Sequence, residues 1–309
     1  MWTALICVVT FVVVLILYHN VKLRFESEKI VPNGKIVKVD GDDFHVYSEG
    51  SPNDKPTLVM MSGSSMPAPV YHYKKLYTLF SDEYRVVVPE KFGYGYSSIN
   101  DSSRDIENIL EQTRQALKLA GEKPPYILMP HSMSGIEAQL WVHKYPDEIR
   151  GIVGLDMALP QHYESMNLGF CQKVYQLSTY VMRAIGVQRL PLIHSAAGVN
   201  DKGSLPEEEW KQEKYLIARN TLNKMIVMES TTILEGALKV KSMGVLDIPM
   251  LLFVSDGTVM KHWLEHYHAF LKNENRARMV ELDCGHMMHN SRAEKIVCEA
   301  KTWIESTLL

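Results

Sequence analysis

The sequence predicts an α/β fold with a mostly parallel, doubly wound β-sheet, preceded by one membrane-spanning helix. Short apolar runs alternate with amphipathic helical stretches over most of the chain, an alternation typical of such sheets. The runs are apolar on both faces, which indicates strands buried between two layers of helices. The composition, with 46% hydrophobic and 22% charged residues, is that of an ordinary globular protein.

The first residues form a separate apolar segment. Trp2 to Tyr18 contains neither a charge nor a proline. As a helix it would reach about 26 Å, close to the ~30 Å of a bilayer core. A cleaved signal peptide would show a basic start and a small-residue cleavage site, which are missing here, and a soluble core helix would show a polar stripe. We therefore expect residues 1–20 to be a transmembrane anchor, followed by a linker over 21–33.

The flanking charges predict the orientation of this anchor. Lys22, Arg24 and Lys29 follow the apolar segment. Positively charged flanks stay on the cytoplasmic side of a membrane. The large C-terminal part is therefore expected in the cytoplasm.

The strands of the predicted sheet begin after the linker. Gly34 to Asp40 and Phe44 to Gly50 are predicted to form an antiparallel hairpin. Six further apolar runs follow, at Thr57–Met61, Tyr84–Val88, Tyr126–Met129, Gly151–Leu155, Met250–Val254 and Arg278–Leu282. Amphipathic helices are predicted between them, at Ile106–Leu119, Ile136–Lys144 and Arg292–Thr307.

One interval is too long for a simple connection between strands. Residues 158–246 have a helical pattern and almost no strand signal. We interpret them as a helical lid that divides the core domain into residues 34–157 and 247–309. Met and Tyr side chains are typical of adaptable apolar pockets, and the lid contains Tyr163, Met166, Tyr175, Tyr180 and Met182.

A nucleophilic serine is predicted where the strand from Tyr126 ends. The segment Pro130-His131-Ser132-Met133-Ser134 follows that strand directly, and an amphipathic helix begins at once after it. Such a sharp turn raises a serine hydroxyl above the sheet edge, at the positive end of the helix. The common pattern has glycines two residues before and after the serine, so Pro130 is a departure. A helix N-cap is the alternative role of Ser132.

A serine nucleophile needs a base and a carboxylate, which in this kind of fold follow in the order Ser, Asp, His. Asp256 follows the strand that ends at Val254, and His286 follows the last strand. Both therefore project at the edge that holds Ser132. We predict Ser132, Asp256 and His286 as the catalytic triad.

From about Gly34 to its end the chain resembles the α/β-hydrolase superfamily, in the branch of prolyl-iminopeptidase-like and esterase-like members with a lid after the sixth strand. Besides the serine turn and Cys284-Gly285-His286, the resemblance rests on three further motifs: Lys91-Phe-Gly-Tyr-Gly-Tyr-Ser97, Tyr145-Pro146 and Gly154-Leu155-Asp156. The resemblance implies an oxyanion hole made of two backbone amides. By position these belong to Met133 and to Ser64 in the loop Ser62-Gly63-Ser64, where the family usually has His-Gly.

Other residues compete for these roles. Asp156 also ends a strand and is the rival acid, although in this family that position more often supports the lid hinge. His289 is the rival base, but no glycine precedes it. His262 and His266 have the spacing of a metal pair, yet no third ligand is apparent, so we expect a solvated face and no metal site.

The predicted reaction is two-step acyl transfer through an acyl-enzyme, which needs no metal and no organic cofactor. The expected substrate is a small molecule with an apolar acyl group, an ester of a medium-sized or lipidic acid, as for a carboxylesterase or lipase. An aminopeptidase or amidase of the same fold stays open, with Glu207, Glu208 and Glu209 as the carboxylates that would bind an amine. A non-catalytic, membrane-anchored ligand receptor or scaffold also stays open.

The totals exclude some partners and sites. A net charge of −3 gives no general attraction for nucleic acid. The four cysteines are scattered and predict neither a disulfide framework nor a zinc site.

Overall fold

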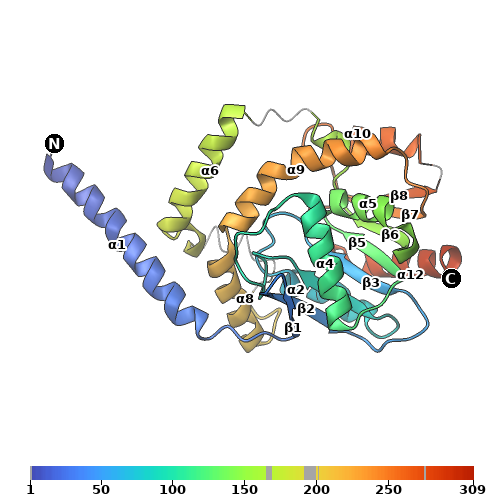
Figure 1. The fold of residues 1–309 in the computed structure, drawn as a ribbon, viewed down its shortest axis with the longest axis horizontal. Helices are drawn as coiled ribbons and strands as arrows, with labels where there is room; N and C mark the ends of the chain where they lie inside the picture. Colours follow the sequence, from blue (N-terminus) through green and yellow to red (C-terminus); the bar gives the residue numbers. More distant parts are fainter. Residues whose placement is uncertain (1, 165–168, 191–199, 201, 275) are drawn as a thin grey trace.

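A computed structural model of the chain describes residues 2–164, 169–190, 200, 202–274 and 276–309. Its centre is one eight-stranded sheet with the order β1-β2-β4-β3-β5-β6-β7-β8 (Figure 1). β1 and β2 pair antiparallel to each other, and β2 pairs antiparallel to β4. All other neighbours are parallel. The mostly parallel sheet and the antiparallel hairpin predicted at its start are confirmed.

The strands lie close to the predicted apolar runs. Their bounds are β1 Lys35–Val39, β2 Asp42–Glu49, β3 Thr57–Met61, β4 Val86–Glu90, β5 Tyr126–Pro130, β6 Ile149–Leu155, β7 Met250–Val254 and β8 Ala277–Glu281. β4 begins two residues later than predicted and continues through Pro89. A proline cannot donate a ladder hydrogen bond. The Arg85 carbonyl accepts from Leu58 of β3, so by alternation the nitrogen of Pro89 also faces β3. Pro89 is tolerated because the pairing of β4 with β3 has ended at Val87.

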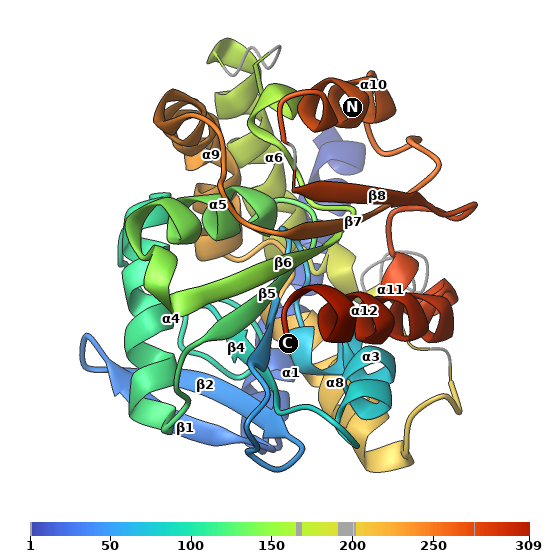
Figure 2. The ribbon, with the colours of Figure 1, turned by 90° about the vertical axis from the view of Figure 1, so that its right-hand side faces the viewer.

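Helices cover both faces of the sheet (Figure 2). α4 (Ile106–Ala120) and α5 (Ser134–Lys144) lie on one face, and α3 (Lys74–Phe80) and α12 (Ala293–Thr307) lie on the other. Two buried apolar clusters result, one for each face. The remaining short helices of the core are α2 (Pro69–His72), η1 (Pro146–Glu148), α10 (Trp263–Leu271) and α11 (Met288–Ser291).

The long interval between β6 and β7 is helical, as predicted. Within the described residues it contains η2 (Pro160–His162), α6 (Gly169–Ala184), η3 (Val187–Arg189), α8 (Glu207–Asn220) and α9 (Lys224–Met243). We call this stretch the helical insertion. Of the methionines and tyrosines that the sequence placed in a lid pocket, Tyr163 is buried but Tyr175 and Tyr180 are exposed on α6. Met166 lies outside the described residues.

A buried charge cluster joins the insertion to the core. Lys91, directly after β4, donates to Glu137 of α5 at 2.7 Å and to Glu229 of α9 at 2.6 Å. Arg104 also binds Glu229, and all four side chains are at most 5% exposed. Burial alone would raise the pKa of Glu229, but Lys91 and Arg104 hold it below its usual value. The cluster therefore ties α9 to the helix that follows Ser132.

The N-terminal helix α1 (Trp2–Ser27) projects away from the body of the molecule (Figure 1). It is long and apolar enough to span a membrane, and only 6% of its most apolar stretch is buried. The helix continues past residue 20, through the first half of the expected linker. Lys22, Leu23, Arg24 and Glu26 are good helix formers, which accounts for this extension.

Candidate active site

Ser132 lies on a strained turn between β5 and α5. Its φ of 52° is in the left-handed region, which is uncommon for a residue other than glycine. The N-cap position of α5 belongs to Met133 and is capped by no side chain, so the alternative role of Ser132 as a helix cap does not hold. The turn is held by Ser134, whose hydroxyl donates to the carbonyls of Met61 and His131 at 2.8 Å each.

Two positions around Ser132 require small residues. A Cβ added at Gly63, in the loop after β3, would lie 2.7 Å from the Cβ of Ser132. A Cβ added at Gly135 would lie 2.4 Å from the carbonyl oxygen of Ala158. Both values are far below van der Waals contact. The glycines thus let the loop after β3 and the loop after β6 close in around the serine.

Pro130 interrupts the pairing of β5 with one neighbour and leaves the pairing with the other intact. The N–H of His131 donates to Met61 of β3 at 3.1 Å. Successive N–H groups of a strand point to opposite sides, so the nitrogen of Pro130 faces β6. Leu128 pairs with Ile152 of β6, and a bridge between His131 and Leu155 resumes this pairing in the same register. The departure from the glycine pattern therefore falls at a local gap in the β5–β6 ladder.

The carboxylate beside His286 is Asp156, not Asp256. His286 Nδ1 lies 2.6 Å from Asp156 Oδ2, and Asp156 is completely buried at the end of β6. Its other oxygen accepts from the Ser255 amide at 3.0 Å and from the Trp263 indole at 2.8 Å. Burial alone would raise the pKa of Asp156. The hydrogen bond to His286, the charge of the imidazolium and the hydrogen bonds from Ser255 outweigh burial, so the pKa of Asp156 lies below its usual value. The carboxylate is thus held ionised against the imidazole.

The prediction that Asp256 orients the histidine is wrong. Asp256 does follow β7 at the expected sheet edge, but its side chain is exposed. Its Oδ1 accepts from the Thr258 amide at 3.0 Å and from the Thr258 hydroxyl at 2.7 Å, as in an ordinary polar turn. These bonds lower the pKa of Asp256. The sequence placed Asp256 correctly at the end of β7. It could not predict the direction in which the Asp256 side chain points.

The two amides predicted for the oxyanion hole lie in the loops that flank Ser132. Met133 follows the serine, and Ser64 follows Gly63, which touches it. In the described part of the chain neither amide has an intramolecular acceptor. Both amides are therefore available to a ligand oxygen, as an oxyanion hole requires. Their use in catalysis stays a prediction.

Other histidines pack behind the candidate base. The His131 ring lies 4.5 Å from that of His286 and 4.9 Å from that of His289, centroid to centroid. His289 is completely buried, and burial lowers its pKa to about 3. Burial likewise holds the pKa of His131 far below its usual value. His289 is thus a neutral packing residue of the interior, and nothing aims it at a substrate.

Two residues that contact this site were not singled out in the sequence. Trp263 binds Asp156 and meets the His286 ring edge-on at 5.9 Å. His162 stacks on Trp263 at 3.8 Å. Both lie in helical segments without a motif, so only their proximity in space reveals them.

No metal site emerges among the described residues. His262 and His266, the suspected metal pair, have separate surroundings. His262 binds the exposed Glu265, and His266 packs near His162 at 5.1 Å. The sequence predicted that both histidines lie on a solvent-exposed helix face. This holds for His262, whereas His266 is partly buried.

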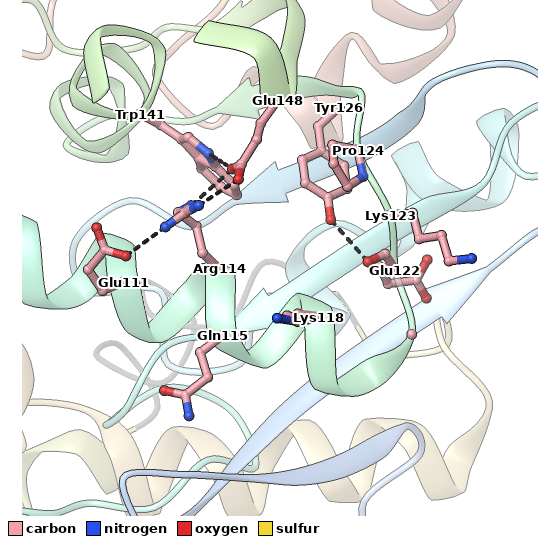
Figure 3. Close-up of a pocket in the computed structure, with 11 residues that line it drawn as sticks. Glu111, Arg114, Gln115, Lys118, Glu122, Lys123, Pro124, Tyr126, Trp141 and Glu148 are labelled. Atoms are coloured by element: carbon pink, nitrogen blue, oxygen red, sulfur yellow. Dashed lines mark hydrogen bonds and ion pairs between the residues drawn. The ribbon is translucent and has the colours of Figure 1, made fainter. Parts of the chain in front are cut away.

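A cleft of about 640 Å³ lies at the opposite end of the sheet (Figure 3). Tyr126, the first residue of β5, lines it, whereas Ser132 follows the last residue of that strand. Arg114 crosses the cleft to Glu148 and Glu111. Three of its charged side chains are thus paired with one another, and none of the candidate catalytic residues lines the cleft.

A sequence profile described as the alpha/beta hydrolase fold matches residues 56–292, which is most of the chain. The chain belongs to the α/β hydrolase fold family. The matched residues include Ser132, Asp156 and His286.

Two curated proteins of Bacillus subtilis are related to this α/β hydrolase. The uncharacterized protein YbdG is 45% identical over 173 residues, 56% of this chain and 53% of YbdG. The uncharacterized protein YqjL is 25% identical over 194 residues, 57% of this chain and 75% of YqjL. The chain thus matches only about half the length of YbdG.

Solved structures of other α/β hydrolases share the fold. A putative lipase from Acinetobacter baumannii superimposes with a TM-score of 0.67 at 17% identity, covering 93% of this chain and 96% of the lipase. A Bacillus megaterium epoxide hydrolase superimposes with a TM-score of 0.65 at 15% identity, covering 88% of this chain and 100% of the hydrolase. A thioesterase domain from the curacin biosynthetic pathway superimposes with a TM-score of 0.61 at 19% identity, covering 88% of this chain and 99% of the thioesterase domain. At such identities the likeness shows the fold alone. The reactions in these names differ from one protein to the next.

Proposed function

We propose that this α/β hydrolase is a serine esterase whose triad is Ser132, Asp156 and His286. The observation that carries the proposal is the 2.6 Å contact between His286 and the buried Asp156. The ring of His131, the residue before the strained Ser132, packs on His286 at 4.5 Å. A buried carboxylate that binds Nδ1 fixes the imidazole tautomer and leaves Nε2 free to accept a proton. A serine hydroxyl needs such a base before it can act as a nucleophile.

The proposed reaction has two steps. Ser132 Oγ attacks the ester carbonyl while its proton passes to His286 Nε2, and the amides of Met133 and Ser64 stabilise the oxyanion. The alcohol leaves with the proton from His286, and an acyl-Ser132 ester stays behind. Water then gives a proton to His286 and attacks the acyl carbon, which releases the acid and restores Ser132. Each amide donor of an oxyanion hole contributes about 3 kcal/mol.

We propose an ester of an apolar acid as the substrate, and the helical insertion as the lid over the site. The insertion begins directly after Asp156, and His162 within it stacks on the tryptophan that binds this carboxylate. The membrane is the proposed location, with α1 as the anchor and the domain in the cytoplasm. The length and apolar surface of α1 support an anchor.

The aminopeptidase alternative loses its main support. Glu207 and Glu208 both pair with Lys211 on the exposed start of α8, at 3.0 and 2.8 Å. Glu209 pairs with Lys74. These three carboxylates therefore already pair with two lysines, and Glu207 and Glu208 lie exposed at the surface.

Labelling with a fluorophosphonate, which reacts with activated serines, tests the proposal. We expect the full-length chain to be labelled in membranes and Ser132→Ala to lose the label. His286→Ala should lose it as well, because the hydroxyl would lack its base. Ser230→Ala on α9 is the matched control and should be labelled like the wild type. A wild-type chain that resists labelling, although it is folded, would overturn the esterase and favour the non-catalytic receptor.

A further inference from the structure

Helix α6 exposes its apolar side. Val174, Leu177 and Val181 are 51%, 67% and 52% exposed and lie three to four residues apart, so they share one face of the helix. Tyr180, 48% exposed, extends this face. A surface helix of a soluble protein turns such a stripe toward the core.

The polar side of the same helix faces the protein. Thr179 is 1% exposed. Arg183 donates to the carbonyls of Thr221 and Arg219 at 2.6 and 2.7 Å. These contacts hold α6 in its orientation. The apolar face is therefore turned outward by specific bonds, the reverse of the usual arrangement.

The position of α6 relates this face to the membrane helix. η3, which follows α6, docks onto α1. The two terminal guanidinium nitrogens of Arg189 donate to the two carboxylate oxygens of Glu26, at 2.9 and 2.6 Å. Arg189 also donates to His19, and Gln188 contacts the same ring at 3.0 Å. His19 is the first residue after the apolar segment Trp2 to Tyr18. The end of α6 is thus fixed where α1 would leave a bilayer.

From this point α6 leads away from α1 and does not run along it (Figure 1). An apolar helix face at that level meets the boundary between headgroups and acyl chains. The segment 169–190 contains no Asp or Glu, so it offers no charge that anionic lipids would repel.

We propose that the apolar face of α6, formed by Val174, Leu177, Tyr180 and Val181, docks on the surface of a lipid bilayer. The partner is the membrane itself, in the leaflet next to which His19 lies. The helical insertion is then held on lipid by two contacts, α1 and α6. This inference goes beyond the esterase proposal and does not depend on catalysis.

Site-directed fluorescence on the full-length chain tests the docking. The four natural cysteines are replaced by serine. Single cysteines that carry a polarity-sensitive fluorophore are then introduced as Leu177→Cys on α6, Val9→Cys on α1 and Leu238→Cys on α9. Leu238 is the matched control, because it is a leucine of the same insertion with 51% exposure. The proteins are placed in phosphatidylcholine–phosphatidylglycerol vesicles with or without a spin-labelled acyl chain that quenches the probe.

We expect the probe at position 177 to shift to the blue and to lose about half its emission to the spin-labelled lipid, since interfacial helices bury their apolar face in the acyl boundary. The probe at position 238 should keep its emission. If position 177 behaves like 238 while position 9 is quenched, the docking of α6 is wrong and the anchor stands. Quenching at 177 without quenching at 9 would support the docking and overturn the anchor. A blue shift at 177 that lipid does not quench and that disappears on dilution would mean that a second copy covers the face, and would overturn the proposal.

Discussion

At the residue scale, the choice of the acid depends on side-chain direction. Asp156 and Asp256 both follow a parallel strand at the same sheet edge, on neighbouring strands β6 and β7. Asp156 turns inward, where the Trp263 indole and the Ser255 amide fix its carboxylate. Asp256 turns outward to Thr258. Chain order alone favours the aspartate after β7, so it could not reveal that the aspartate after β6 contacts His286.

Paired substitutions separate the two aspartates. Asp156→Asn should lower kcat for ester hydrolysis by about four orders of magnitude, because an amide at this position favours the wrong imidazole tautomer. Asp256→Asn should leave kcat close to that of the wild type. Kinetics on one soluble ester check both. An equal loss in the two variants, or a larger one for Asp256→Asn, would contradict the assignment.

The buried His289 predicts a dependence of stability on pH. Its folded pKa is about 3, below the ~6.5 of an unfolded histidine. Between these values the unfolded chain binds a proton that the folded chain does not, so the free energy of unfolding falls as the pH is lowered through this window. Above pH ~6.5 both states are neutral at this residue and the effect is absent.

His289→Phe removes this titration. Relative to the wild type, the variant should gain about 2 kcal/mol more in unfolding free energy at pH 5 than at pH 7.5. Both ring nitrogens of His289 lack a hydrogen-bond partner among the described residues, so a phenyl ring leaves no polar group behind. Denaturant titrations at the two pH values check the difference. Equal gains at both would contradict a neutral, buried His289.

At the scale of elements, one buried cluster holds the insertion on the core. Glu229 on α9 is the shared partner of Lys91 and Arg104. Lys91 also binds Glu137 on α5, the helix that follows the candidate nucleophile. A change in this cluster therefore acts on both the insertion and the site. The apolar periodicity of α5 and α9 gives no sign of it.

Glu229→Gln should destabilise the protein by about 3–5 kcal/mol, because it leaves two buried cations without their full counter-charge. Glu107→Gln is the matched control, since Glu107 pairs with Lys239 and likewise joins α4 to α9. Both side chains of that pair are about two-fifths exposed. Its loss should cost less than about 1 kcal/mol, because water screens an exposed pair. Similar losses in the two variants, measured by denaturant unfolding, would contradict the assigned role of burial.

At the scale of the whole molecule, α1 and the hydrolase domain are linked by more than the chain. Glu26 and His19 of α1 bind Arg189 of the insertion. The anchor proposed for this protein is therefore part of its tertiary structure. An orientation of α1 in the membrane would also orient the insertion.

Protease protection tests the proposed cytoplasmic orientation. Protease added to intact cells should spare the domain, and permeabilisation should expose it, because Lys22, Arg24 and Lys29 keep their end of α1 inside. The control is the triple variant in which Glu replaces these three residues. In part of its molecules the domain should lie outside the cell. Cleavage of the wild-type domain on intact cells would refute this orientation.

Most of the fold and two residues of the candidate site could be predicted from the sequence. Apolar runs and their spacing predicted the parallel sheet, the hairpin and the helical insertion, since burial on two helix-covered faces demands apolar residues at every strand position. The turn at Ser132 and the place of His286 were also readable, because strand ends and small residues leave local patterns. Only the tertiary structure decided which carboxylate meets His286, which side of α6 faces outward and what Glu229 holds together. These depend on contacts between residues far apart in the chain, and the direction of a side chain at a strand end is settled by the neighbours that pack around it.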